Sequence, residues 1–201
     1  MKNLLLKLFA LSTLMVFTGI QGQKTSKYKK KSGPDFKFGA LVGANYANIN
    51  GWDSSADPKF IFGINAGMYT YYQFSEKIGL QLEATYTNFG SDVKFETAGT
   101  TLKERLDYIA IPLLLKPRFD NFYITAGPQL LILVSAKENG HDIKESLNTT
   151  DFGLTGGLGY YFTENFGIDL RYTHGMSDIV KDSTFEKLTN NAFAGRLFYQ
   201  F

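Results

Sequence analysis

The chain has 201 residues, of which 20 are glycine, 18 are phenylalanine and 12 are tyrosine, and none is cysteine. This composition is typical of a β-rich protein, and the length fits one domain. The absence of cysteine excludes a disulfide framework, a thiolate metal site and thiol redox chemistry. The formal net charge is +2, but residues 36–201 carry 14 basic and 18 acidic side chains, so no basic nucleic-acid-binding footprint remains.

Residues 1–22 are predicted to be a signal peptide. Lys2 and Lys7 precede an apolar run over residues 8–20. This run is shorter than the roughly 20 apolar residues that a transmembrane helix needs. Gly22 supplies a small residue for cleavage. The alternative, an uncleaved anchor, is disfavoured because residues 21–34 do not continue the apolar run. Residues 23–35, with five lysines, are expected to form a basic flexible periplasmic linker.

From residue 36 onward the apolar side chains recur with a period of two, which predicts strands and not helices. The fourth predicted strand is the least regular, because Leu114 lies out of phase and Pro112 cannot donate a ladder hydrogen bond. The eight predicted strands cover residues 36–46, 60–73, 78–87, 109–115, 122–134, 151–162, 166–173 and 193–201.

The connections between these strands alternate between short and long. Short turns on one rim, long polar loops on the other and an even strand number are typical of outer-membrane barrels. Residues 36–201 are therefore predicted to form an all-β, eight-stranded antiparallel up-and-down transmembrane β-barrel with both termini in the periplasm. The short links are 75–77, 118–121 and 163–165, and the long ones are 47–59, 90–101, 137–149 and 177–189.

A soluble lipocalin-like barrel shows the same alternation, so the polar face has to discriminate between the two. Outside the fourth strand this face carries few charges among many Gly, Thr, Asn and Gln residues, which suits a narrow lumen better than a water-facing exterior. The apolar face places aromatic residues near strand ends, as in the girdles at the two lipid interfaces. A membrane barrel is favoured. The charges counted are Lys37, Glu83, Asp151, Asp169, Arg171 and Arg196.

Several lumen charges lie at a similar predicted height. Glu83, Arg171 and Arg196 are each five residues from the expected periplasmic end of their strand. Arginines that point into a filled lumen need acceptors. We interpret these residues as a structural cluster that closes the lumen, with a gated ion path as the alternative. The predicted cluster consists of Gln81, Glu83, Asp169, Arg171 and Arg196.

Phe201 ends the chain in phase with Tyr199 on the apolar face. A C-terminal aromatic residue in this position resembles the signal that the outer-membrane barrel assembly machinery reads. The alternative is a girdle residue that only anchors the strand.

Catalytic and cofactor motifs are weak. His174 and Ser177 raise the possibility of a lipid acyl hydrolase, but spacing fixes no partner carboxylate, so no enzyme is expected. His141 and His174 make no metal cluster. The glycine-rich residues 153–159 lie within a strand that no helix follows, unlike a phosphate loop. We expect neither a metal nor a cofactor.

Four segments resemble the PorT-like outer-membrane β-barrel domain family, often labelled porin family. The resemblance covers essentially all of residues 36–201 and implies a small closed barrel in a Gram-negative outer membrane. Most members of that family have no assigned activity, and the few implicated in secretion lend no transferable functional residue. The segments are 106–116 (LDYIAIPLLLK), which is the most specific, 126–128 (AGP), 151–161 (DFGLTGGLGYY) and 169–179 (DLRYTHGMSDI).

Taken alone, the sequence predicts a monomeric outer-membrane barrel with a structural or interaction role in the cell envelope, acting through its long extracellular loops. The expected partners are outer-membrane lipids, the barrel assembly machinery and an extracellular or envelope protein. A narrow small-solute or ion channel is the second hypothesis, and an outer-membrane lipid hydrolase is the third.

Overall fold

The computed structural model of the chain describes residues 35–53, 56–95, 99–181 and 187–201. The predicted signal peptide and residues 23–34 of the predicted linker lie outside the described residues. The described strands are β1 (Asp35–Asn50), β2 (Ala56–Lys59), β3 (Ile61–Gln73), β4 (Ile78–Phe95), β5 (Thr100–Phe119), β6 (Phe122–Glu138), β7 (His141–Asp142), β8 (Thr150–Tyr161), β9 (Phe166–Gly175) and β10 (Thr189–Gln200), with a 3₁₀ helix η1 (Lys144–Ser146).

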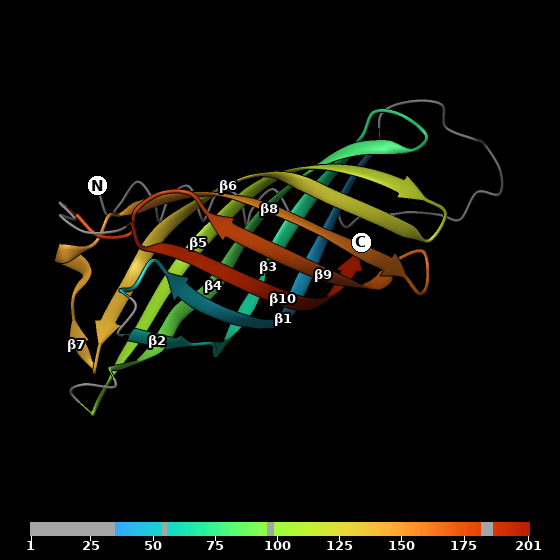
Figure 1. The fold of residues 1–201 in the computed structure, drawn as a ribbon. Coiled ribbons are helices and arrows are strands. Elements are labelled where there is room, and N and C mark those ends of the chain that lie inside the picture. Colours follow the sequence, from blue (N-terminus) through green and yellow to red (C-terminus); the bar gives the residue numbers. More distant parts are fainter. Residues whose placement is uncertain (1–34, 54–55, 96–98, 182–186) are drawn as a thin grey trace. The chain divides into compact units, whose positions relative to one another are not determined.

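Eight of the strands form a closed antiparallel ring in the order β1, β3, β4, β5, β6, β8, β9, β10 (Figure 1). The ring closes between the first and last strands, in a register that runs from the pair Gly39 and Gln200 to the pair Asn50 and Thr189. This arrangement confirms the predicted eight-stranded up-and-down barrel. The short strands β2 and β7 pair with the ends of β4 and β6. Among the described residues, no helix is long and apolar enough to cross a membrane.

The two ends of the ring differ. At one end, called the turn end here, residues 74–77, 120–121 and 162–165 connect the strands, and both Asp35 and Phe201 lie there. The other end, the loop end, carries the longer connections between β1 and β3, β6 and β8, and β9 and β10, and the connection over residues 96–99 between β4 and β5. The predicted alternation of short and long links is therefore confirmed, except between β4 and β5.

The predicted loop over residues 90–101 was wrong in extent, because β4 continues to Phe95 and β5 begins at Thr100. Inward side chains continue to be buried over this extension, including Phe89 and Val93. The outward side chains of the extension are instead charged, for example Lys94 and Arg105. The hydrophobic alternation that marks a lipid-facing strand therefore stops before the strand itself does.

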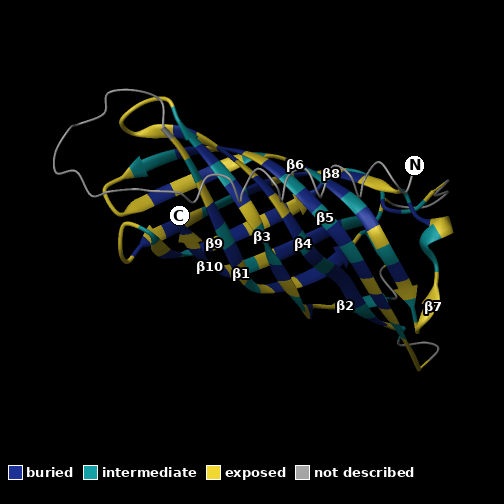
Figure 2. Cartoon of the chain, turned by 180° about the vertical axis from the view of Figure 1, so that it is seen from behind, coloured by how far each residue is buried: buried dark blue, intermediate teal, exposed yellow. Residues whose placement is uncertain are grey.

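Buried and exposed residues alternate along the strands of the ring (Figure 2). The outward positions hold large apolar side chains that are widely exposed, such as Phe62 at 81% and Phe152 at 58%. Apolar exposure on this scale is not typical of a soluble monomer. In β5, Pro112 and Leu114 are buried and point inward, which explains the irregular pattern of the fourth predicted strand.

Candidate functional site

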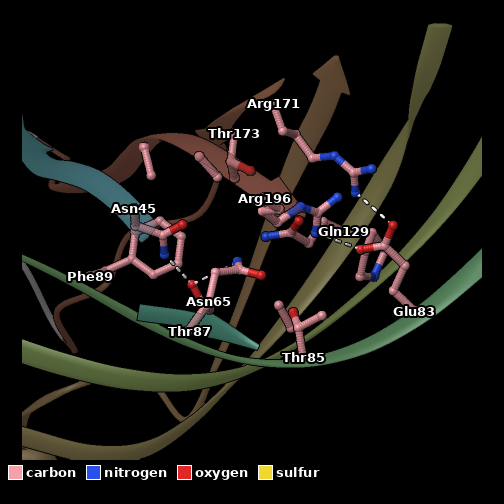
Figure 3. A pocket seen from close by; sticks show the side chains of 14 residues that line it. Asn45, Asn65, Glu83, Thr85, Thr87, Phe89, Gln129, Arg171, Thr173 and Arg196 are labelled. Atoms are coloured by element: carbon pink, nitrogen blue, oxygen red, sulfur yellow. Dashed lines mark hydrogen bonds and ion pairs between the residues drawn. The ribbon is translucent and has the colours of Figure 1, made fainter. Parts of the chain in front are cut away.

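The middle of the lumen holds two carboxylates between two arginines. Glu83 on β4 accepts from Arg171 Nη1 at its Oε1 and from Arg196 Nη1 at its Oε2, both at 2.9 Å (Figure 3). Asp169 accepts from Arg171 Nη2 at 3.1 Å and from Arg196 Nη2 at 2.7 Å. Gln81 Nε2 donates to Glu83 Oε1 at 2.7 Å. These five residues are called the ionic layer here.

The ionic layer spans the ring. Strands β4 and β9 lie four places apart in either direction around the ring, so the ion pair between Glu83 and Arg171 joins opposite walls. All five members of the layer are buried. A buried charge is tolerated when it is paired and hydrogen-bonded, and each carboxylate here bonds both guanidinium groups.

The structure brings together the five residues of the predicted lumen cluster and leaves two other predicted lumen charges outside it. Lys37 is half-buried near the turn end. Asp151 is buried towards the loop end, where its Oδ2 accepts from Asn190 Nδ2 at 3.0 Å.

Sequence reasoning missed Lys116, which is fully buried on the turn-end side of the ionic layer. Its Nζ donates to Gln81 Oε1 at 2.8 Å and to the Tyr161 hydroxyl at 3.2 Å, and lies 3.9 Å from the centre of the Tyr123 ring. Such contacts stabilise an ammonium group by cation–π attraction. The other rings within 6 Å of the Nζ are those of Tyr69, Tyr71, Tyr161 and Phe198.

These rings belong to a buried cluster that fills the turn-end part of the lumen. The cluster is called the aromatic layer here and consists of Leu41, Tyr69, Tyr71, Tyr123, Tyr161 and Phe198.

Glycines make room for these rings. Gly159 pairs with Tyr123 across β6 and β8, and Gly39 pairs with Tyr69 across β1 and β3. A Cβ atom at either glycine would overlap the Cζ of the facing tyrosine. The rings therefore lie against bare backbone. An inward aromatic residue opposite a glycine was the sequence signal that would have revealed this layer.

The loop end of the lumen is filled by apolar side chains. Leu147 and Ile179 come from the connections at the loop end and pack among strand residues. Trp52 is partly buried and packs against this cluster. Leu147 also forms a β-bridge with Val180. This apolar layer consists of Ala47, Ile49, Phe89, Leu106, Tyr108, Ala110, Leu131, Leu133, Ala136, Leu147, Ile179 and Ala192.

Little space remains between the layers. A cavity of about 20 Å³ lies between the ionic and apolar layers, bordered by Asn65, Arg171 and Phe89 among others (Figure 3). A second, of about 10 Å³, lies between Lys116 and Arg196. Each has room for about one water molecule. Side chains therefore fill the lumen along the described part of the chain.

The sequence model of the protein family described as outer membrane protein beta-barrel domain matches residues 21–181, which is most of the chain. The chain belongs to this family. No curated protein is significantly similar to it. Family membership assigns the barrel to the outer membrane, and the outward apolar side chains are accordingly the surface that meets lipid.

The chain is similar to solved structures at low sequence identity, and the first of those named here shares its fold. Neisserial surface protein A is 17% identical over 82% of this chain and 97% of its own, with a TM-score of 0.54. OprG from Pseudomonas aeruginosa is 16% identical over 85% of this chain and 97% of its own, with a TM-score of 0.49. Ail of Yersinia pestis, in complex with the heparin analogue sucrose octasulfate, is 15% identical over 82% of this chain and 99% of its own, with a TM-score of 0.48.

His174 and Ser177 make separate contacts in this outer-membrane barrel. His174 is exposed near the loop end of β9, and its Nδ1 lies 2.6 Å from Asn191 Oδ1. The Ser177 hydroxyl accepts from the Phe152 amide at 3.0 Å. An amide, and not a carboxylate, thus orients the imidazole. Among the described residues, no three His, Cys, Asp or Glu side chains gather as a metal site.

Phe201 follows the end of β10 and is 66% exposed. Its amide donates to the Phe38 carbonyl at 2.8 Å, and its ring lies 5.6 Å from that of Tyr199. The C-terminal ring is therefore on the lipid-facing side of the turn end.

One acidic group lies beyond the lipid-facing band, on the extension of β5. Glu104 is buried, its Oε2 has no hydrogen-bond partner, and it pairs in register with Glu138 of β6. Burial, together with the negative charge of Glu138, raises the pKa of Glu104 to about 7.

Proposed function

We propose that this protein is a non-conducting outer-membrane barrel with a structural or interaction role in the cell envelope, exerted through its loop end. The observation that carries the proposal is the filled lumen. The aromatic, ionic and apolar layers follow one another along the barrel axis, and the cavities between them hold about one water each. A pathway for solutes would have to displace all three layers.

The proposed orientation places the turn end in the periplasm and the loop end outside the cell. Short turns on the periplasmic side and long loops on the outside are the rule for barrels of this type. Both ends of the barrel chain are then periplasmic, and the C-terminal strand with Phe201 is the element that the assembly machinery reads. We assign the barrel no enzymatic activity.

The narrower PorT-like assignment is part of the same proposal and rests on residues 106–116. The inward side chains of this segment contribute to the packing of the lumen from one end to the other. Leu106 and Tyr108 belong to the apolar layer, and Lys116 lies within the aromatic layer. The segment therefore serves to close the lumen.

The surface offered for interaction is the extension of β4, β5 and β6 beyond the lipid-facing band. Its outward side chains are charged and exposed, among them Lys94, Lys103 and Lys137. An ion pair between Arg105 and Asp92 at 2.7 Å joins two of its strands. This rigid, polar sheet is suited to contact a protein of the envelope or of the cell surroundings.

Single-channel recording in planar bilayers tests the filled lumen. We expect no stable conductance for the wild-type protein, and none for Arg171→Ala, because the aromatic and apolar layers still close the lumen. Stable channels in wild type would favour the ion-channel alternative and overturn the proposal.

Photo-crosslinking in intact cells tests the interaction surface. A crosslinking amino acid at Lys94 or Lys103 is expected to trap a protein partner, whereas one at the exposed turn-end residue Glu164 serves as the matched control. Equal products from both ends would contradict a role specific to the loop end.

A further inference from the structure

The lipid-facing surface is hollowed on one side. A groove of about 530 Å³ crosses the outward faces of β3, β1, β10, β9 and β8. Large side chains border it, namely those of Phe62, Leu158, Leu170, Tyr172 and Phe193, whereas Ala44, Gly156 and Gly195 line it with a methyl group or none.

The two lining glycines are not required by the backbone or by the barrel interior. A Cβ atom at Gly195 would meet its nearest neighbour, Leu170 Cδ2, at 3.7 Å, and one at Gly156 would meet the Thr125 carbonyl at 3.4 Å. Neither residue has the positive φ that favours glycine. By contrast, a Cβ at the neighbouring inward glycine Gly157 would overlap the Leu170 carbonyl. The small residues of the groove thus keep space open on the outside of the wall.

We propose that this groove binds an acyl chain of an outer-membrane lipid. The groove is continuous with the apolar band that meets the membrane, and its exposed lining is almost wholly apolar. Asn45 and Arg171 also border it, but their side chains are hydrogen-bonded inside the lumen, to Thr87 and Glu83 respectively. The occupant is therefore a hydrocarbon chain and not a headgroup.

The shape of the groove distinguishes a lipid from a second copy of the protein. A two-fold dimer places the same patch on both partners, so that a concave surface would face a concave surface. A flexible acyl chain can fill a hollow between rigid aromatic rings and gains apolar contact along its length. The groove begins at the level of the ionic layer, beside Arg171, and extends towards the loop end, where Tyr172 and Phe193 border it. The chain is thus drawn from the leaflet at that end.

Filling the groove tests the proposal. Ala44→Leu and Gly195→Leu each place a branched side chain in the groove. Ala44→Leu leaves the conformational freedom of the backbone unchanged, because Ala44 already carries a Cβ. Ala84→Leu is the matched control, since Ala84 is an exposed small residue on the outward face of β4 and does not border the groove. Heat-dependent migration on a mild-detergent gel confirms that each variant is folded.

The measurement is native mass spectrometry of protein extracted from outer membranes in mild detergent. We expect the wild type and Ala84→Leu to retain a single outer-membrane lipid after the detergent is removed, and both groove variants to lose it at least tenfold more readily. Equal retention by all four proteins, or no retention by the wild type, would overturn the proposal. A lipid-free wild-type dimer that Gly195→Leu converts to a monomer would overturn it in favour of a second copy.

Discussion

Gln81 links Lys116 to Glu83. It accepts from the buried ammonium at 2.8 Å through Oε1 and donates to the carboxylate at 2.7 Å through Nε2. Through this one amide, the cation of the aromatic layer is joined to the ionic layer, although the two charges do not contact each other. The lumen is thus held as one hydrogen-bonded unit across two of its three layers.

Replacing Gln81 should show this coupling. Gln81→Leu leaves Lys116 Nζ without one of its two acceptors, and a hydrogen bond to a charged group contributes about 1.5 to 3 kcal/mol. We expect a loss of stability in this range, measured by denaturant unfolding in detergent. In a Lys116→Met background, which keeps the volume but removes the charge, the same substitution should cost clearly less. Identical losses in both backgrounds would show that the amide does not couple the layers.

Removal of Glu83 should be more damaging. Glu83→Ala leaves two buried guanidinium groups sharing one carboxylate, and an uncompensated buried charge typically costs about 3 to 5 kcal/mol. The midpoint of denaturant unfolding is expected to fall accordingly. Glu164→Ala, at an exposed carboxylate of the turn end, is the control and should change stability by less than about 0.5 kcal/mol. Equal midpoints for the two variants would refute a stabilising role of the ionic layer.

Two glycines of β8 offer a test of the aromatic layer. At Gly159 a methyl group would overlap the Tyr123 ring, which is held on all sides, and overpacking of this kind costs about 1 to 3 kcal/mol. We expect Gly159→Ala to lower the unfolding midpoint and Gly156→Ala, outward on the same strand, to be nearly neutral. Tyr123→Leu should lessen the effect of Gly159→Ala, because the smaller side chain makes room. The absence of such relief would locate the strain elsewhere.

The loop-end extension should respond to pH through Glu104. Its pKa is raised from 4.5 to about 7 by burial and by Glu138, so the folded state binds the proton more tightly than the unfolded state. This contribution to stability is complete below about pH 4.5 and is lost as pH rises through 7. Wild-type stability should therefore fall between pH 5 and pH 8 by on the order of 2 to 3 kcal/mol more than that of Glu104→Gln. Parallel pH profiles, measured by denaturant unfolding, would contradict the assignment.

Deletion of Phe201 separates anchoring from assembly. Losing one interfacial aromatic side chain removes about 1 to 3 kcal/mol of burial free energy, which a closed barrel should survive. If the residue is an assembly signal, the deletion should sharply lower the amount of inserted protein in cells, while the purified chain still refolds in detergent. Normal insertion in cells would leave only the anchoring role.

The fold was predictable because alternate residues of each strand of a membrane barrel face the lipid and the lumen. The two environments select apolar and polar side chains respectively, and this alternation is visible in the sequence. Of the lumen, the charged pairs were also predictable, since few polar residues can face each other across so narrow a ring. Lys116 was missed because Pro112 and Leu114 obscured the phase of its strand. The aromatic layer was missed because alternation gives the side on which Tyr123 lies but not what it packs against. The true length of β4 and β5 was hidden because their outward residues beyond the lipid are polar.

The ion pair between Glu83 and Arg196 joins residues 113 positions apart in the chain. Arg196 lies on the last strand of the ring, so the ion pairs of the ionic layer cannot all form until that strand has been synthesised and has closed the ring against β1. A chain that stops before β10 would hold Glu83 and Asp169 with only one of their two arginines. Contacts over such long separations also form slowly. Completion of the ionic layer therefore coincides with the final closure of the wall, and in an unfinished barrel its two carboxylates share a single guanidinium group.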